Sequence, residues 1–545
     1  MKKSITLLFL LITTLLSAQL KVGNIDLNFG KTITSKDGDI VAIAGEKDNT
    51  IYALARKKRN FFLQTFDSKT KEFKTSSLLK FDKINGKKLQ IEDLSFVGDK
   101  IFLMTSYYDK KAKTYNFLAK EISGNKIIKT TNILSIPVAS NRKRGTFVFT
   151  SSYDGYNYLV SHVGIDTRKE TLNYSIVLVD DRLTKVLEDD YETQFEEKNR
   201  QYFDFSDVQV NEHGDVLIAT TESYRDKKAK TNINNITIHS YLENENYAKK
   251  TTIITLSGKR ALNCSLIETK DNKLHAIGFY SELRKSGRAK ITIEGIYDAT
   301  FDYKTGEVTK KTFNDFTVET KSKLIGERRA KKGKDLAPYY SNIALIERAN
   351  GGVIVLSEYN LVMAGGSSGI GPLQITTYIY DSNEIIVTAL NPDGTLDWSN
   401  VIPKEQRVKV SELGFVLAFG GGSGNVTVSA AFYIPLTVIG KGPEFLSAIP
   451  IYENGQLTVL VNDDPKNIGT TDIDDVRKVR NINKMIPVAF SFNEKTGEMT
   501  RTDPTDFEKK QIVVRPAVNC RLSGNNYIIY GGNKKGNSLG EMIIK

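Results

Sequence analysis

Few residues in this chain have the types and spacing that catalysis or metal binding requires. Its four histidines are His162, His213, His239 and His275, and none is paired with another His or with a Cys at ligand spacing. His275 alternates with apolar neighbours, as in a packed strand, and His213 lies in the turn-like sequence Glu212–Asp215. No Gly-x-Ser-x-Gly elbow is present and no cysteine has a nearby histidine, so nucleophilic hydrolysis has no sequence support. We expect the histidines to be structural.

Two groups of acidic residues could do other chemistry. Asp204 and Asp207 could form the carboxylate pair of a glycosidase if the fold set them at the right separation. The acidic run from Asp463 to Asp475 offers oxygens for calcium but lacks the ordered spacing and central glycine of a known calcium loop. We expect this run to be a solvated insertion, and we expect no metal site and no cofactor. A hydrolase stays an alternative.

Two glycine-rich segments resemble phosphate-binding loops at first sight. They span Ala364–Gly371 and Gly420–Gly424, and neither ends in the Gly-Lys-Ser/Thr sequence that such a loop requires. We expect both to be loops between strands.

The elements that must position these residues are β-strands. From Gln19 to Lys545, short β-rich runs alternate with turn residues, and almost no stretch has helical periodicity. One unit recurs: a strand, a Gly/Asp/Asn turn, a second strand, a polar loop and two more strands. The first five second strands begin 50 to 59 residues apart, a period that suits a four-stranded propeller blade. The second strands are predicted to begin at Thr50, Lys100, Tyr156, Asp215, Lys273, Gly352, Gln456 and Asn526.

This repeat predicts an all-β fold, a single β-propeller of about eight four-stranded blades, with seven as the alternative. The propeller domain spans residues 19–545, after a leader at residues 1–18, with insertions near 361–374 and 408–443. The last unit has only about three strands, and Val22–Ile33 forms a spare strand-like segment before the first unit. We expect N- and C-terminal strands to close the ring, because closure pairs both open sheet edges.

A basic loop follows each of the first five second strands. Equivalent loops of successive blades emerge on the same face, so we expect a basic arc on one rim that attracts an anionic partner. The alternative is that basic hairpin tips only keep the sheet edges soluble. The run Lys321–Lys334 lies between two blades and either adds to this charge or is a plain solvated linker. The predicted arc consists of Lys57, Lys58, Arg59, Lys110, Lys111, Lys113, Arg168, Lys169, Lys227, Lys228, Lys230, Arg284, Lys285, Arg288 and Lys290.

The N-terminal residues have the three-part pattern of a secretory signal peptide. Lys2 and Lys3 precede an apolar run, Ile5–Leu16, and the small residues Ser17-Ala18, which predicts cleavage near Ala18. No later stretch has the apolar length of a transmembrane helix. The net charge of +12 favours an anionic envelope partner, and no nucleic-acid module is present, so we expect no nucleic acid to be bound.

One segment carries a resemblance to a known group of proteins. The sequences Tyr378–Asp381, Ile385–Val387, Leu390–Leu396, Trp398 and Ile402–Lys404 resemble a strand–turn–strand signature of exported Bacteroidota proteins of unassigned function. They are also similar, more loosely, to the outer hairpins of quinoprotein-type propellers. The resemblance implies a propeller and an exported protein, and it implies no activity and no quinone. On physical grounds, Asp393-Gly394 supplies the turn and Trp398 is expected to pack between blades.

Together these features predict a binding protein rather than an enzyme. We expect an exported propeller in the periplasm or at the outer membrane that binds an anionic or acidic envelope partner, most simply a protein, and serves in a secretion or assembly complex. A periplasmic, plug-type subunit of the type 9 secretion translocon would suit its size and compartment. The alternatives are a hydrolase acting on glycans at the central channel, and a secreted glycan-binding or adhesin module.

Overall fold

The computed structural model describes most of the chain after the predicted leader. Within residues 18–545 the segments outside the description are 34–37, 81–83, 85–88, 167–170, 195–200, 227, 229, 272, 284–289, 291, 369–374, 414–420, 424–425, 431–435, 437, 480, 506–511, 524–525 and 534–535. The predicted leader, residues 1–18, lies outside the described residues except for Ala18.

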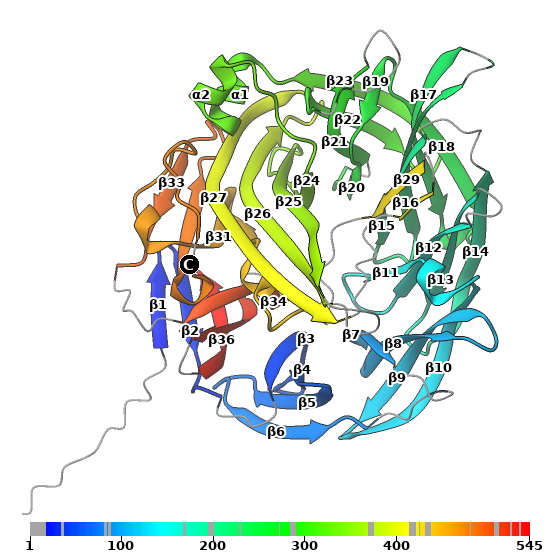
Figure 1. The fold of residues 1–545 in the computed structure, drawn as a ribbon, viewed down its shortest axis with the longest axis vertical. Helices are drawn as coiled ribbons and strands as arrows, with labels where there is room; N and C mark the ends of the chain where they lie inside the picture. The colour runs from blue at the N-terminus through cyan, green and yellow to red at the C-terminus, as the bar shows by residue number, and fades with distance from the viewer. Residues whose placement is uncertain are drawn as a thin grey trace, which may run out of the picture.

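Eight antiparallel sheets stand around one axis and form a closed ring, as Figure 1 shows. The predicted all-β, eight-bladed propeller is therefore confirmed. In blades 1 to 7 the strands run in chain order from the centre of the ring outward, and the innermost strands of several neighbouring blades contact one another.

The first four blades follow one another without interruption. Blade 1 consists of β3 (Asp39–Lys47), β4 (Thr50–Lys57), β5 (Asn60–Asp67) and β6 (Phe73–Leu78). Blade 2 consists of β7 (Gln90–Val97), β8 (Lys100–Asp109), β9 (Thr114–Ser123) and β10 (Lys126–Pro137). Blade 3 consists of β11 (Thr146–Ser151), β12 (Tyr158–Asp166), β13 (Thr171–Val179) and β14 (Lys185–Gln194). Blade 4 consists of β15 (Gln201–Val210), β16 (Val216–Asp226), β17 (Thr231–Tyr241) and β18 (Lys249–Thr255).

The next three blades carry the longer connections. Blade 5 has β19 (Lys259–Ala261) and β20 (Ser265–Glu268), both paired with β21 (Leu274–Glu282), then β22 (Gly295–Asp302) and β23 (Glu307–Asp315). Blade 6 consists of β24 (Tyr340–Glu347), β25 (Val353–Ser368), β26 (Ile375–Leu390) and β27 (Leu396–Leu413). Blade 7 consists of β30 (Ala448–Glu453), β31 (Gln456–Asp463), β32 (Ile486–Phe492) and β33 (Met499–Thr502). All eight predicted second strands are the second strands of their blades, and each begins within two residues of its predicted start.

Blade 8 joins the two ends of the chain. Its strands β34 (Val513–Ser523), β35 (Asn526–Asn533) and β36 (Gly536–Ile544) are completed by β2 (Ile25–Phe29) and β1 (Ala18–Val22). The strands β2 and β36 pair from Ile25 opposite Ile544 to Phe29 opposite Gly540. The predicted closure by both termini is thus confirmed, and it uses two N-terminal strands.

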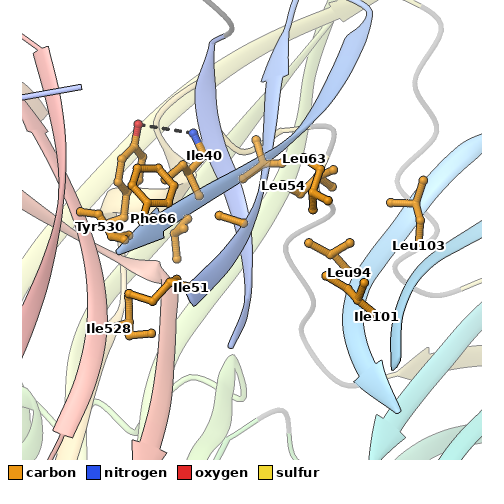
Figure 2. Close-up of a cluster of buried hydrophobic side chains, with 14 of the residues drawn as sticks. Ile40, Ile51, Leu54, Leu63, Phe66, Leu94, Ile101, Leu103, Ile528 and Tyr530 are labelled. Atoms are coloured by element: carbon orange, nitrogen blue, oxygen red, sulfur yellow. Dashed lines mark hydrogen bonds between the residues drawn. The ribbon is translucent and has the colours of Figure 1, made fainter. Parts of the chain in front are cut away.

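Apolar side chains between adjacent blades hold the ring together. Figure 2 shows one such cluster, in which Ile528 and Tyr530 of blade 8 lie beside Ile40 and Ile51 of blade 1. The Tyr530 hydroxyl accepts a hydrogen bond from the Ile40 N–H at 3.3 Å. Leu94, Ile101 and Leu103 extend the same cluster into blade 2, so burial couples three blades.

Blade 6 extends beyond the ring wall. Its long strands cross in front of the centre of the ring in Figure 1, and their outer parts pair Asn360–Ser368 with Ile375–Ser382 and Thr376–Ser382 with Gln406–Glu412. Beyond β27, the strand β29 (Val426–Ala430) pairs with β28 (Gly421–Ser423) and, in parallel, with β15 of blade 4. Residues that we expected to be glycine-rich loops therefore lie partly in strands, because pairing with distant partners overrides the local loop signal of glycine.

Two short helices connect blades 5 and 6, where the sequence predicted a linker. They are α1 (Val318–Ile325) and α2 (Glu327–Lys331), and the described part of the chain has no longer helix. The Thr317 hydroxyl accepts the Thr320 N–H at 3.1 Å and caps α1, while Leu324 and Ile325 enter the core. No helix in the described residues is long and apolar enough to cross a membrane.

Candidate functional site

The strand order places the chain connections on two opposite faces of the ring. Because successive strands of a blade are antiparallel, the connection between the second and third strands lies at the same end as the connection to the next blade. We call this end the basic face. The turns that join the first to the second strand, and the third to the fourth, lie at the other end, which we call the acidic face.

All the described residues of the predicted arc lie at or beside connections of the basic face. Lys57, Lys58 and Arg59 lie at the β4–β5 turn, Lys110, Lys111 and Lys113 at the β8–β9 turn, and Lys228 and Lys230 at the β16–β17 turn, all of them exposed. Lys290 precedes β22, but its ammonium pairs with Glu282 at 2.7 Å and Glu294 at 3.2 Å, so its charge is neutralised within blade 5. The remaining arc residues, Arg168, Lys169, Lys227, Arg284, Lys285 and Arg288, lie outside the described residues.

The repeated string Asp-Lys-Lys-Ala-Lys-Thr forms the same kind of turn in two blades. The Asp109 carboxylate accepts the backbone N–H of Lys111 at 2.9 Å, and that of Asp226 accepts the N–H of Lys228 at 2.8 Å. The last lysine of each string, Lys113 or Lys230, has a positive φ of 54°. In these turns the aspartate carboxylate accepts a hydrogen bond from a backbone N–H, and the lysine side chains lie in solvent.

The run Lys321–Lys334, for which the sequence left open added charge or a plain linker, also reaches this face. Its exposed residues Arg328, Arg329 and Lys331 lie in α2, which connects blades 5 and 6.

The opposite face carries the other sign of charge. Its turns contain more acidic than basic residues, whereas basic residues clearly outnumber acidic ones in the connections of the basic face. This segregation makes the ring an electrical dipole along its axis, and it was not visible before the strand order was known. Exposed acidic residues of the acidic face include Asp48, Asp99, Asp154, Glu212, Glu243, Glu245, Asp271, Asp393 and Glu498.

A cavity of about 980 Å³ lies inside the ring, between the innermost strands of several blades. The outer part of blade 6 and the segment after it form part of its wall through Leu361, Val362, Leu436 and Ile439. Arg56 of blade 1 fixes that segment by donating to the Leu436 carbonyl at 2.9 Å and to the Ile439 carbonyl. The polar residues of the lining are Asp93, Asp204, Ser206, Asp207, Asn263, Cys264, Ser265, Tyr339, Tyr340, Ser341, Asn342, Glu358, Asn360, Ser447 and Asn519.

Asp207 and Asp93 occupy equivalent places in blades 4 and 2. Each follows a β-bulge in the innermost strand and accepts the N–H of the next residue at 2.8 Å. Asp207 also accepts the Leu266 N–H of blade 5 at 2.7 Å, and Asp93 the Tyr158 hydroxyl of blade 3 at 3.3 Å. Burial raises the pKa of both carboxyls, that of Asp207 to about 6. Both therefore join neighbouring blades, and no sequence signal singled out Asp93.

The other acidic residues considered from the sequence have partners. Asp204 accepts the Ser206 hydroxyl at 2.7 Å and lies in the cavity wall beside Asp207, so the structure brings together the two carboxylates of the predicted pair. Asp463 is buried against Arg501, whose guanidinium lies at 2.9 Å, rather than solvated as we expected. Among the described residues, no group of three or more His, Cys, Asp or Glu could hold a metal ion.

Three of the four histidines are buried in packing positions. His162 contacts the Arg144 carbonyl at 2.6 Å, and burial lowers its pKa to about 4. His239 lies at 3.0 Å from the Thr251 hydroxyl and packs on Tyr174 and Tyr191, and burial likewise lowers its pKa to about 4. His275 pairs with Asp298 at 2.9 Å, while His213 is exposed in its turn.

Trp398 packs between blades 6 and 7, as the sequence predicted. Its ring stacks on Phe492 with centroids 6.0 Å apart, and its N–H donates to the Glu494 carbonyl at 2.9 Å. Gly394 of the adjoining turn has a φ of 79°, which glycine adopts freely.

Solved structures found by comparison are similar to this chain only at low sequence identity. The WD40 domain of SCAP from fission yeast is 8% identical over 96% of this chain and 98% of its own, with a TM-score of 0.35. The Dos1 propeller is 8% identical over 94% of both chains, with a TM-score of 0.37. The GH93 alpha-L-arabinofuranosidase of Fusarium graminearum is 8% identical over 59% of this chain and 95% of its own, with a TM-score of 0.29. No protein-family model and no curated protein matches the chain.

Proposed function

We propose that this chain is an exported, non-enzymatic binding protein of the cell envelope that holds an anionic partner against its basic face. The observation that carries the proposal is the segregation of charge between the two faces of the ring. The exposed lysines of three described hairpin turns, in blades 1, 2 and 4, add their fields on one face, so together they attract an extended anionic surface more strongly than scattered charges would.

The leader-like N-terminus supports the proposal that the protein is exported. Cleavage after Ala18 would leave Gln19–Val22 to form β1, so the ring would keep its closing strand. The periplasm or the outer membrane is the proposed location, and a subunit of a secretion or assembly complex, such as the type 9 translocon, is the proposed role.

A glycan hydrolase is the second candidate, because Asp204 and Asp207 line one cavity. We rank it lower, since Asp207 is held by Val208, Gln209 and Leu266, which gives its carboxylate a structural task.

Charge reversal on one face tests the proposal. The variant carries Lys58→Glu, Lys110→Glu, Lys111→Glu and Lys228→Glu, all in exposed turns of the basic face. The matched control carries Lys69→Glu, Lys270→Glu, Lys304→Glu and Lys495→Glu, which make the same change of charge on the acidic face. We expect the amount of envelope material that copurifies with the tagged protein to fall at least tenfold for the first variant and to stay unchanged for the control. Equal recovery with both variants would remove the basic face from the function.

A further inference from the structure

The central cavity continues as a groove toward the acidic face. A depression of about 450 Å³ shares Asp207, Ser265 and Asn342 with the cavity wall. It follows β15 and β20 as far as Asn211 and Glu268, where both strands reach their turns on the acidic face. Cavity and groove thus form one path from that face to the interior of the ring.

The walls of this path carry one sign of charge. Among the described residues that line them, neither the cavity nor the groove has a lysine, arginine or histidine, although the chain has 76 lysines and arginines against 64 acidic residues. The lining carboxylates are Asp93, Asp204, Asp207, Glu268 and Glu358. These carboxylates disfavour an anionic ligand in the interior.

Glu358 is neutralised by a buried base. Lys404 lies at 2.5 Å from Glu358, and both side chains are fully buried. Asp207, by contrast, receives its hydrogen bonds from neutral groups: the N–H groups of Val208 and Leu266 and the amide of Gln209. One of its oxygens, Oδ1, accepts only the Val208 bond among these, so a lone pair remains for a further donor.

We propose that the cavity binds a small organic cation carrying a primary amine or guanidinium group, which enters along the groove and pairs with Asp207. The acidic face draws such a cation toward Glu268 at the mouth of the groove, and field lines focused by the low-dielectric walls guide it inward. Tyr339 and Phe149 also line the cavity, and aromatic rings attract cations. The combined space suits a ligand of ordinary metabolite size.

The protonation of Asp207 gives the binding a pH dependence. Because burial raises the pKa of this carboxyl to about 6, the ionised form that the cation needs predominates above that pH. Binding of the cation favours the ionised form and so lowers this pKa. We expect the affinity to fall as the pH decreases from 7 to 5, roughly tenfold for each unit below the pKa in the free protein.

Calorimetric titration of the purified full chain with agmatine, which carries both cationic groups, tests the proposal. We expect saturable one-site binding at pH 7 and a loss of at least tenfold in affinity for Asp207→Asn. Glu212→Gln is the matched control, since this exposed carboxylate lies in the turn after β15 but outside the groove. A thermal melt of each variant shows whether the ring is intact.

A second variant covers the case in which Asp207→Asn unfolds the protein. Ser265→Lys places an ammonium in the wall shared by cavity and groove while all the hydrogen bonds of Asp207 stay possible. We expect it to abolish agmatine binding. No binding to the folded wild-type chain, unchanged binding to the folded variants, or equal competition by arabinose or calcium would each overturn the proposal. The basic-face variants are expected to bind agmatine normally, so this site and the proposed function can fail separately.

Discussion

At the scale of single residues, Lys404 and Glu358 form the most deeply buried ion pair among the described residues. Lys404 also donates to the Ser382 hydroxyl at 2.8 Å and to the Gln406 side chain at 3.2 Å, so its ammonium has partners besides Glu358. Burial lowers the pKa of Lys404, and the neighbouring Glu358 opposes that shift. The pair lies where the strands of blade 6 leave the ring wall. It therefore holds β25 and β27 together where their outer parts begin.

Removing one partner of this pair should cost far more than removing both. Lys404→Met leaves a buried carboxylate without its cation, and we expect about 3–5 kcal/mol of lost stability. The double variant Lys404→Met with Glu358→Leu should recover most of that loss. Urea unfolding of both variants checks this. The exposed pair Lys331 and Glu327 of α2 provides the control, and Lys331→Met should change stability by about 0.5 kcal/mol or less. A single variant as stable as the wild type would show that Glu358 is not held as an ion in this pair.

The structural histidines could be predicted because His275 alternates with apolar neighbours, and His162 and His239 proved to be structural too. The burial and the partners of the acidic residues could not be predicted in the same way. Asp463 is part of a buried pair only because Arg501, which is far along the chain, returns beside it. Asp93 matters through its place on an innermost strand, which neither its type nor its neighbours in the sequence reveal.

At the scale of elements, the two N-terminal strands decide whether the ring is closed. They bury Leu20, Val22, Ile25, Leu27 and Phe29 against blades 7 and 8. Each buried side chain of this kind contributes about 1.5–3 kcal/mol, so their sum is comparable to the whole stability of a typical domain.

A chain that begins at Asp39, without β1 and β2, should therefore lose its cooperative fold or aggregate through the open edge of β36. A chain that begins at Gln19 is the matched control and should melt like the full-length protein. Size-exclusion chromatography and thermal melting distinguish the two. If the Asp39 chain stays monomeric with an unchanged melting temperature, the N-terminal strands do not contribute to closure.

The second strands could be predicted because a regular period and a local turn signal both mark them. The outer parts of β25, β26 and β27 could not, since Gly365 and Gly366 indicate a loop locally. The residues on either side of these glycines, Ala364 and Ser367, pair with Tyr378 and Thr376, so the strand continues past an irregularity in register. The helix α1 was missed because one turn of apolar residues, Leu324 and Ile325, is too short to show a helical period.

At the scale of the whole molecule, the strand order turns scattered charges into two faces of opposite sign. The sequence alone predicted five basic loops on one rim, and the loop lysines that are described lie at that rim. The acidic face and the path that leads inward from it could not be predicted, because they depend on which turns share an end of the ring and which innermost strands are neighbours. The two faces give the protein a defined orientation toward any charged partner.

Site-specific photo-crosslinking in the native cell envelope tests this orientation most directly. Each variant carries one crosslinking residue in a turn between strands. The positions on the basic face are Arg59, Lys111 and Lys228, and those on the acidic face are Glu212, Lys304 and Asn454. We expect crosslinks to the same envelope component from the three positions of the basic face and none from the other three. Crosslinks to one component from both faces alike, or from the acidic face alone, would contradict this expectation.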